Sequence, residues 1–515
     1  MSGTRLLAVP ELLRWVLSNL SVAELAPLLG ASCAFLEAGS QLVWKELHDP
    51  LPLFAPLLKP SDSPRAEHEP LKITIPNKVD RKVWQRFRLY ASCVRKLTNY
   101  GRSMAGPVEW HGLEKLRSFA PITPNVRVLW LTWRAEDPVV QPYWDMIWLF
   151  LGSATTSLRC HGDWSRGSSA EPMTSVLERA RDVRSALVDL TLSSTALISR
   201  EELRALESRL QPFSQVCTLR LNTSMIDGAI MSYIRRLPNL RTLTLSDPRN
   251  FLDRAHRWKP LPIEQGWTGE PYPSLNSVCL SQFGGRMVER LLAGQPSLLR
   301  NVTSLNLEMH CGTDRAAPIR SLCEVFRLVA NTSRSLHDLT VEWSSSMEVA
   351  YRIPAQALAV LFPLHLRRLT LHYIRLNKDS LGISEIQGEW PALTHLILPH
   401  QPAWPTDLVQ LAQRKTLRVL SVDIKPPRQI DSDAMADTHP SPRPVAPFCL
   451  KSQFNLGSVG LPQINELARP LFKCWPDLTL EWHGPVSGWS SIEEPTREGL
   501  ELLMQGVEEA RSESG

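Results

Sequence analysis

A short apolar pattern recurs along most of the chain and constrains its fold more than any other feature. Apolar residues occupy positions i, i+3 and i+5 of six-residue segments such as "LVDLTL" from Leu187 and "LRTLTL" from Leu240. From 187 to 417 these segments begin 24 to 35 residues apart. The pattern predicts a strand with one buried face, and its period predicts repeated units that stack into one core. Further copies begin at Val94, Val126, Leu158, Val216, Leu275, Val302, Leu336, Leu366, Leu393, Leu417 and Trp475.

Helix-like segments lie between these strands, among them "SREELRALESRL" from 199, "IRSLCEVFRLVA" from 319 and "TDLVQLAQ" from 406. A strand followed by a helix in every unit requires crossover connections and gives a parallel sheet. We therefore predict an α/β fold over residues 79–482, a leucine-rich-repeat-like solenoid with a curved parallel sheet and outer helices. The Pro-rich segment 425–447 has too little apolar content to fold and is predicted to be a loop, and 483–515 is predicted to be a C-terminal tail.

The N-terminal segment has a different period. In "VPELLRWVLSNLSVAEL", residues 9–25, apolar side chains recur at helical spacing. Ser21 and Glu24 have the spacing of a capping box, so a second helix is predicted to begin there. A third helix is expected from about Cys33 to Leu47, interrupted at Gly39 and Ser40. We predict a three-helix domain over residues 1–48 and a polar, Pro-rich linker over 49–78. So small a core leaves apolar surface for a partner.

Residues 9–47, "VPELLRWVLSNLSVAELAPLLGASCAFLEAGSQLVWKEL", resemble an F-box. The resemblance lies in the Val-Pro-Glu-Leu-Leu opening, the Leu-rich helix pair and the closing Val-Trp. The chain as a whole is similar to the F-box proteins with degenerate leucine-rich repeats that are numerous in fungi. F-box domains dock on the Skp-type adaptor of cullin–RING (SCF) ubiquitin ligases; the alternative is an unrelated helical cap on the solenoid. The resemblance implies that the following residues form the F-box core or contact the adaptor: Pro10, Leu12, Leu13, Val16, Leu17, Leu20, Leu25 and Trp44.

Composition argues against several classes of partner. The net charge is only +5 and no basic block stands out, so a nucleic-acid partner is not expected. The richest apolar runs fall short of the ~20 residues that a membrane-spanning helix needs, so no membrane partner is expected. Nine cysteines are scattered without a C-x-x-C pair, which favours reduced thiols. We expect a protein of the cytoplasm and/or nucleus.

Motifs for catalysis or metal binding are not recognisable in the sequence. It has no G-x-S-x-G, H-E-x-x-H, Walker or dinucleotide-binding pattern. His310 and Cys311 have no third ligand nearby. His372 and His395 are not expected to bind a metal, because no Cys or third His occupies the facing positions and Arg368 would repel a cation. We therefore expect no enzyme activity, no metal and no cofactor; an enzyme with an unrecognised site is the weakest alternative.

Charged residues gather on the predicted outward positions of the later strands. The second, fourth and sixth residues after the first apolar residue of each motif face away from the core, on the side that is concave in such solenoids. Most of these residues are Ser or Thr, but neighbouring later units carry both signs of charge. We predict that they bind the target protein; the alternative is that they only solvate the sheet. This bipolar patch consists of Glu308, Asp338, Glu342, Arg368, His372 and His395.

Together these patterns lead to one functional hypothesis and one alternative. The chain is expected to be the substrate-recognition subunit of an SCF-type ubiquitin ligase. Its F-box would dock the adaptor and its repeats would bind an unknown protein target. Catalysis would then come from positioning rather than from residues of this chain. The alternative is a leucine-rich-repeat scaffold or inhibitor unrelated to ubiquitin.

Overall fold

The computed structural model describes eighteen segments of the chain, which divide between two compact units. Unit 1 comprises Met1–Arg241 with Lys259–Pro262, and unit 2 comprises Thr242–Trp258 with Ile263–Gly515. Residues 58–70 of the predicted linker and 426–447 of the predicted Pro-rich loop lie outside the described residues. The described residues are 9–57, 71–76, 78–99, 108–132, 147–162, 171–194, 200–247, 272–310, 317–344, 350–354, 356–377, 389–412, 416–425, 448–452, 468, 471, 478–482 and 493–513.

The described part of unit 1 begins with three short helices, α2 (Pro10–Leu17), α3 (Val22–Leu28) and α4 (Cys33–Val43). The predicted capping box is confirmed: the Glu24 carboxylate accepts a hydrogen bond from the Ser21 backbone N–H at 2.7 Å, and the Glu24 N–H donates to Ser21 Oγ. The predicted interruption of the third helix at Gly39 and Ser40 is wrong. Helix α4 runs through both residues. A side chain at Gly39 would meet Leu29 Cδ2 at 2.5 Å, so the glycine allows close packing against Leu29.

Six parallel strands of unit 1 pair in the order β1, β3, β5, β6, β7, β8. Their leucines stand in one register row, Leu97, Leu129, Leu158, Leu190 and Leu219, all at most 1% exposed. The strands are β1 (Glu46–Leu47), β3 (Lys96–Asn99), β5 (Val128–Thr132), β6 (Ser157–Gly162), β7 (Asp189–Ser194) and β8 (Thr218–Asn222). A separate parallel pair joins β2 (Leu71–Thr74) to β4 (Val108–His111).

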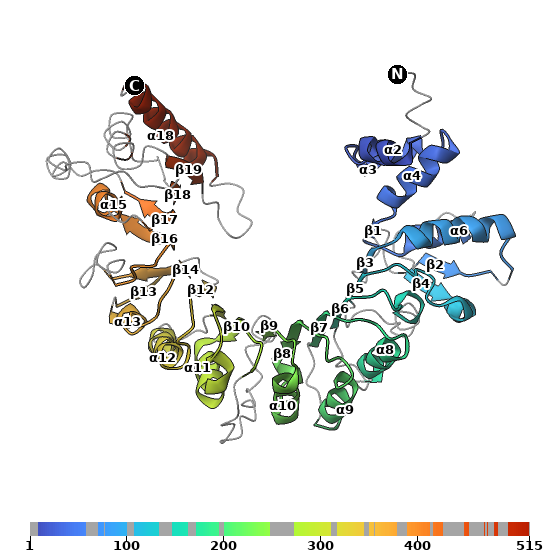
Figure 1. Ribbon diagram of the computed structural model, residues 1–515, viewed down its shortest axis with the longest axis horizontal. Helices are drawn as coiled ribbons and strands as arrows, with labels where there is room; N and C mark the ends of the chain where they lie inside the picture. Colours follow the sequence, from blue (N-terminus) through green and yellow to red (C-terminus); the bar gives the residue numbers. More distant parts are fainter. Residues whose placement is uncertain are drawn as a thin grey trace. The chain divides into compact units, whose positions relative to one another are not determined.

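The remaining helices of unit 1 follow the strands in sequence. Figure 1 shows α8, α9 and α10 on the same side of β6, β7 and β8, and neighbouring helices of the three contact one another. These elements are α5 (Leu51–Phe54), η1 (Ala55–Leu57), α6 (Arg81–Cys93), η2 (Leu113–Phe119), α8 (Glu171–Asp182), α9 (Arg200–Leu210), η3 (Thr223–Met225) and α10 (Gly228–Arg236).

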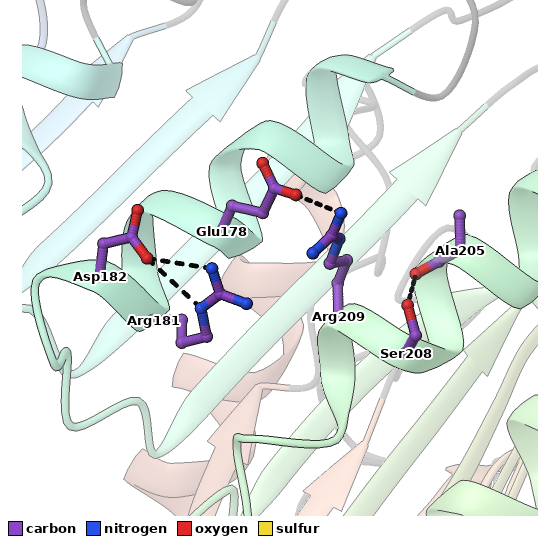
Figure 2. A network of polar contacts seen from close by, with 6 residues as sticks. All are labelled: Glu178, Arg181, Asp182, Ala205, Ser208 and Arg209. Carbon is purple, nitrogen blue, oxygen red and sulfur yellow. Dashed lines mark hydrogen bonds and ion pairs between the residues drawn. The ribbon is translucent and has the colours of Figure 1, made fainter.

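Ion pairs connect exposed side chains on the surface of this helix layer. Figure 2 shows Arg209 of α9 paired with Glu178 of α8, and Arg181 paired with its neighbour Asp182 at 3.1 Å. These side chains are well exposed, and exposed ion pairs contribute only ~0–1 kcal/mol. The stacking of the helices rests instead on buried apolar residues such as Leu177 and Leu206.

Unit 2 repeats the arrangement with nine parallel strands. They pair in the order β9 (Thr242–Ser246), β10 (Ser277–Gly284), β11 (Ser304–His310), β12 (Asp338–Ser344), β14 (Arg368–His372), β16 (His395–Ala403), β17 (Val419–Ile424), β18 (Phe448–Ser452) and β19 (Leu478–Trp482). A small parallel pair joins β13 (Tyr351–Ile353) to β15 (Ile374–Leu376). The helical elements are α11 (Gly285–Gly294), η5 (Pro296–Leu299), α12 (Ala317–Thr332), α13 (Gln356–Ala359), α15 (Pro405–Ala412) and α18 (Glu493–Glu513).

The predicted alternation of parallel strands with helices is confirmed over the described residues, which form a leucine-rich-repeat-like α/β arrangement. Most strands begin two residues after the first apolar residue of a predicted motif, and helices occupy the segments expected from 199, 319 and 406. Two details differ from expectation. Strand β18 forms where no motif was recognised, and residues 493–513 of the predicted tail are the helix α18, whose Leu503 and Val507 are buried.

Candidate protein-interaction sites

The eight predicted adaptor-binding residues separate into a core and an exposed set. Leu13, Leu17 and Leu25 are at most 2% exposed and form the core of the three-helix unit with Ala38. Leu20 packs against that core and is partly buried. These leucines hold the three helices together and are not available to a partner.

The opposite side of α2 is apolar and exposed. Leu12 is 49% exposed, Val16 38% and Trp15 69%, and Val9 just before the helix is 39% exposed. Residues spaced by three or four share one side of a helix, so Val9, Leu12, Trp15 and Val16 form one α2 apolar face. Trp15 was missed by the sequence reasoning, although it included Leu12 and Val16; the available signal was the three-residue spacing from Leu12 to Trp15.

The remaining two predicted residues, Pro10 and Trp44, belong neither to the leucine core nor to the α2 apolar face. Pro10 is exposed at the first turn of α2. Trp44 stacks on Tyr90 of α6, with ring centroids 4.6 Å apart and planes inclined by 11°. Trp44 therefore links the three-helix unit to the repeats. Strand β1, which lies within the predicted boundaries 1–48, pairs with β3 and strengthens the same connection.

The six predicted target-binding residues lie on four adjacent strands of unit 2. Strand register places Glu308, Glu342 and His372 in one row on β11, β12 and β14. It places Asp338, Arg368 and His395 in a second row on β12, β14 and β16. The structure thus brings the whole bipolar patch together on one face of the sheet.

Burial, and to a lesser extent neighbouring charges, shift the pKa values of Glu342 and His395 in this patch. Ser281 Oγ donates a hydrogen bond to the Glu308 carboxylate, while burial and then the charge of Glu308 raise the pKa of Glu342. Burial, followed by the nearby charge of Arg368, lowers the pKa of His395. The patch therefore offers a carboxylate pair at one row and a cationic guanidinium in the other, which suits a partner carrying charges of both signs.

The described part of the chain contains neither a metal-binding cluster nor a membrane-spanning helix. Within it, no group of three or more His, Cys, Asp or Glu side chains is arranged to hold a metal ion. Cys311 of the His310–Cys311 pair lies outside the described residues. Among the helices that are described, none combines the length and the apolar content that crossing a bilayer requires.

Comparison with known proteins gives matches at the level of structure. No protein-family profile and no curated protein sequence matches the chain. The leucine-rich-repeat-containing protein LegL7 from Legionella pneumophila matches with a TM-score of 0.31 and 15% identity over 73% of this chain and 97% of the other. The plant peptide hormone receptor RGFR1, solved in complex with RGF2, matches with a TM-score of 0.28 and 15% identity over 81% and 69% of the two chains.

A third match is the leucine-rich-repeat ectodomain of the plant receptor kinase GASSHO1/SCHENGEN3 from Arabidopsis thaliana. Its TM-score is 0.22, with 11% identity over 77% of this chain and 45% of the other. All three TM-scores are low, so the leucine-rich-repeat-like arrangement is inferred from the strand pairing and register described above.

Proposed function

We propose that the chain is a non-enzymatic substrate receptor of an SCF-type ubiquitin ligase. Its three-helix unit would dock the Skp-type adaptor as an F-box, and its repeats would hold the target protein. The observation that carries the proposal is the α2 apolar face, which leaves Leu12, Trp15 and Val16 exposed on a helix whose other side is the core.

An exposed cluster of this kind is costly for a free protein in water. Large apolar side chains favour burial by ~1.5–3 kcal/mol each, and contiguous apolar patches mark interaction sites. Tryptophan is also enriched among the residues that dominate binding energy in protein interfaces. A partner helix or groove that covers α2 would bury these side chains without disturbing the leucine core beneath them.

Adaptor binding is tested by pull-down and calorimetric titration of the intact chain with a Skp-type adaptor. We expect Trp15→Ser and Val16→Ser to weaken binding at least tenfold. The matched control is Leu89→Ser on α6, because Leu89 is as exposed as Val16, 38% in each case, and it should leave binding unchanged. An intact chain that does not bind, or variants that bind like the control, would instead favour the scaffold hypothesis.

Target binding is proposed for the bipolar patch. Its two rows lie four residues apart along the strands, about 13 Å, a distance that about four residues of an extended target segment can span. The test is a quantitative comparison of proteins that co-purify with the wild-type chain and with a Glu308→Lys, Glu342→Lys, Arg368→Glu variant. Loss of specific partners is expected; an unchanged set of partners would contradict the assignment.

A further inference from the structure

A second polar surface lies on the strands of unit 1, outside the predicted patch. Strand register places Trp130 of β5, Arg159 of β6, Thr191 of β7 and Arg220 of β8 side by side in one row. We call these four residues the arginine row. On each strand, the residue of the arginine row is next in sequence to buried core residues. Because successive side chains of a strand point to opposite faces, all four share the face of the sheet that points away from the core.

Arg159 is held in place by two neighbours. Its guanidinium lies over the Trp130 ring, 5.0 Å from the ring centroid, and its Nη2 donates to Asp189 Oδ2 at 3.3 Å. Ser157 Oγ donates to the same carboxylate oxygen at 2.9 Å. A cation fixed between an aromatic ring and an ion-pair partner loses little side-chain entropy when a ligand binds. Trp130 and Arg159 therefore form a pre-ordered pair of side chains, called here the Trp130–Arg159 platform.

Arg220 differs from Arg159 because no carboxylate among the described residues pairs with it. Its side chain is exposed, and within the described part of the chain it has no ion-pair partner. Along β5 to β8 the described outward positions carry two guanidinium groups and one carboxylate, that of Asp189, which Arg159 already engages. The surface thus retains one excess positive charge at Arg220, next to the aromatic platform.

We propose that the arginine row binds an acidic segment of a protein partner. Arg220 would donate two parallel hydrogen bonds to a carboxylate, and the Trp130–Arg159 platform would contact a large apolar or aromatic side chain. Tryptophan and arginine are the residue types that most often dominate protein interfaces. Charge complementarity therefore selects an aspartate or glutamate side chain as the group held at Arg220.

The distance between the strands also sets how far apart the two contacting residues of the bound segment must be. Trp130 and Arg220 are three strands apart, which corresponds to about 14 Å across the sheet. An extended peptide spans about 3.3–3.6 Å per residue, so about four residues cover that distance. The partner segment is thus one in which an acidic residue and a large apolar residue stand about four positions apart.

The experiment selects a phage-displayed library of random twelve-residue peptides on the intact chain. Enriched peptides are then synthesised with a fluorophore, and their affinities are measured by fluorescence anisotropy. Each peptide is also made with its acidic residue changed to the matching amide. The same titrations use Arg220→Gln and, as a matched control, Arg204→Gln, since Arg204 is an exposed arginine on the helix α9 of the same unit.

We expect enrichment of peptides with Asp or Glu about four positions from a large apolar residue. Arg220→Gln and the amide peptides should each bind about tenfold or more weakly, whereas Arg204→Gln should bind like the wild type. Enrichment of neutral or basic peptides, failure to enrich any peptide, or equal affinity for Arg220→Gln would overturn the proposal. Adaptor binding does not involve this row and should survive Arg220→Gln, so failure here is distinguishable from failure of the proposed ligase function.

Discussion

Replacing Leu17 by alanine is expected to destabilise the three-helix unit while the repeats stay folded. Leu17 is 1% exposed and packs with Leu13, Leu25 and Ala38 in a core of only a few fully buried side chains. Solenoid units draw their stability from their own residues and from their nearest neighbours. The loss should therefore be confined to α2, α3 and α4 and to the α6 region that they contact.

The size of the effect follows from how far the site can relax. Rigid cores lose ~2–5 kcal/mol for a leucine-to-alanine change, and the loss increases with the cavity that remains. Leu20 and Leu28 are only partly buried against this core and can move into the vacated space. We therefore expect the lower part of that range, about 2–3 kcal/mol, which corresponds to an about 30- to 150-fold larger population of the locally opened state.

Amide hydrogen exchange measured by mass spectrometry reports this opening segment by segment. Peptides from α2 to α4 should lose protection in Leu17→Ala, and peptides from α9 and α10 should not. The comparison variant is Val16→Ala, because Val16 is 38% exposed and a surface change of this kind shifts stability by ~0.5 kcal/mol or less. Equal losses of protection in both variants, or a loss that spreads to α9 and α10, would refute the division of α2 into a core side and an exposed face.

Two further predictions concern ionisation and backbone conformation. Burial and the charge of Glu308 raise the pKa of Glu342 above its ordinary value of 4.5. The folded protein therefore binds this proton more tightly than the unfolded chain does. The stability that protonation contributes is lost as the pH rises through the folded-state pKa. Glu342→Gln should therefore melt at a higher temperature than the wild type at pH 7, by a margin that shrinks toward pH 4.5; a constant margin in thermal melts would contradict this. Gly112 has φ of +82°, and a Cβ there would lie 3.1 Å from the Ile75 carbonyl oxygen. Gly112→Ala should therefore lower the free energy of unfolding in urea by about 1–2 kcal/mol. An unchanged urea midpoint would contradict this and show that the turn relaxes.

Much of the repeat architecture could be predicted from local sequence. A strand that buries every second side chain must present apolar residues at alternate positions, as Leu190 and Leu192 do on β7. Together with Leu187, two residues before that strand, they mark one repeat without knowledge of its neighbours. Strand β18 could not be found in this way, because "FCLKS" does not follow the pattern. It forms because β17 and β19 on either side supply its hydrogen-bond partners, and such partners come from residues distant in sequence.

The sequence by itself also determined that residues 10–28 form two helices, through the capping box at Ser21 and Glu24 and the helical period of the leucines. It could not determine which side of α2 is buried, because Leu12 and Leu13 are chemically alike and both recur at helical spacing. Only the packing of α3 and α4 covers Leu13 and leaves Leu12 exposed. The same holds for Arg159 and Arg220: their types are readable from the sequence, but their alignment in one row depends on strand register, which is a property of the assembled sheet.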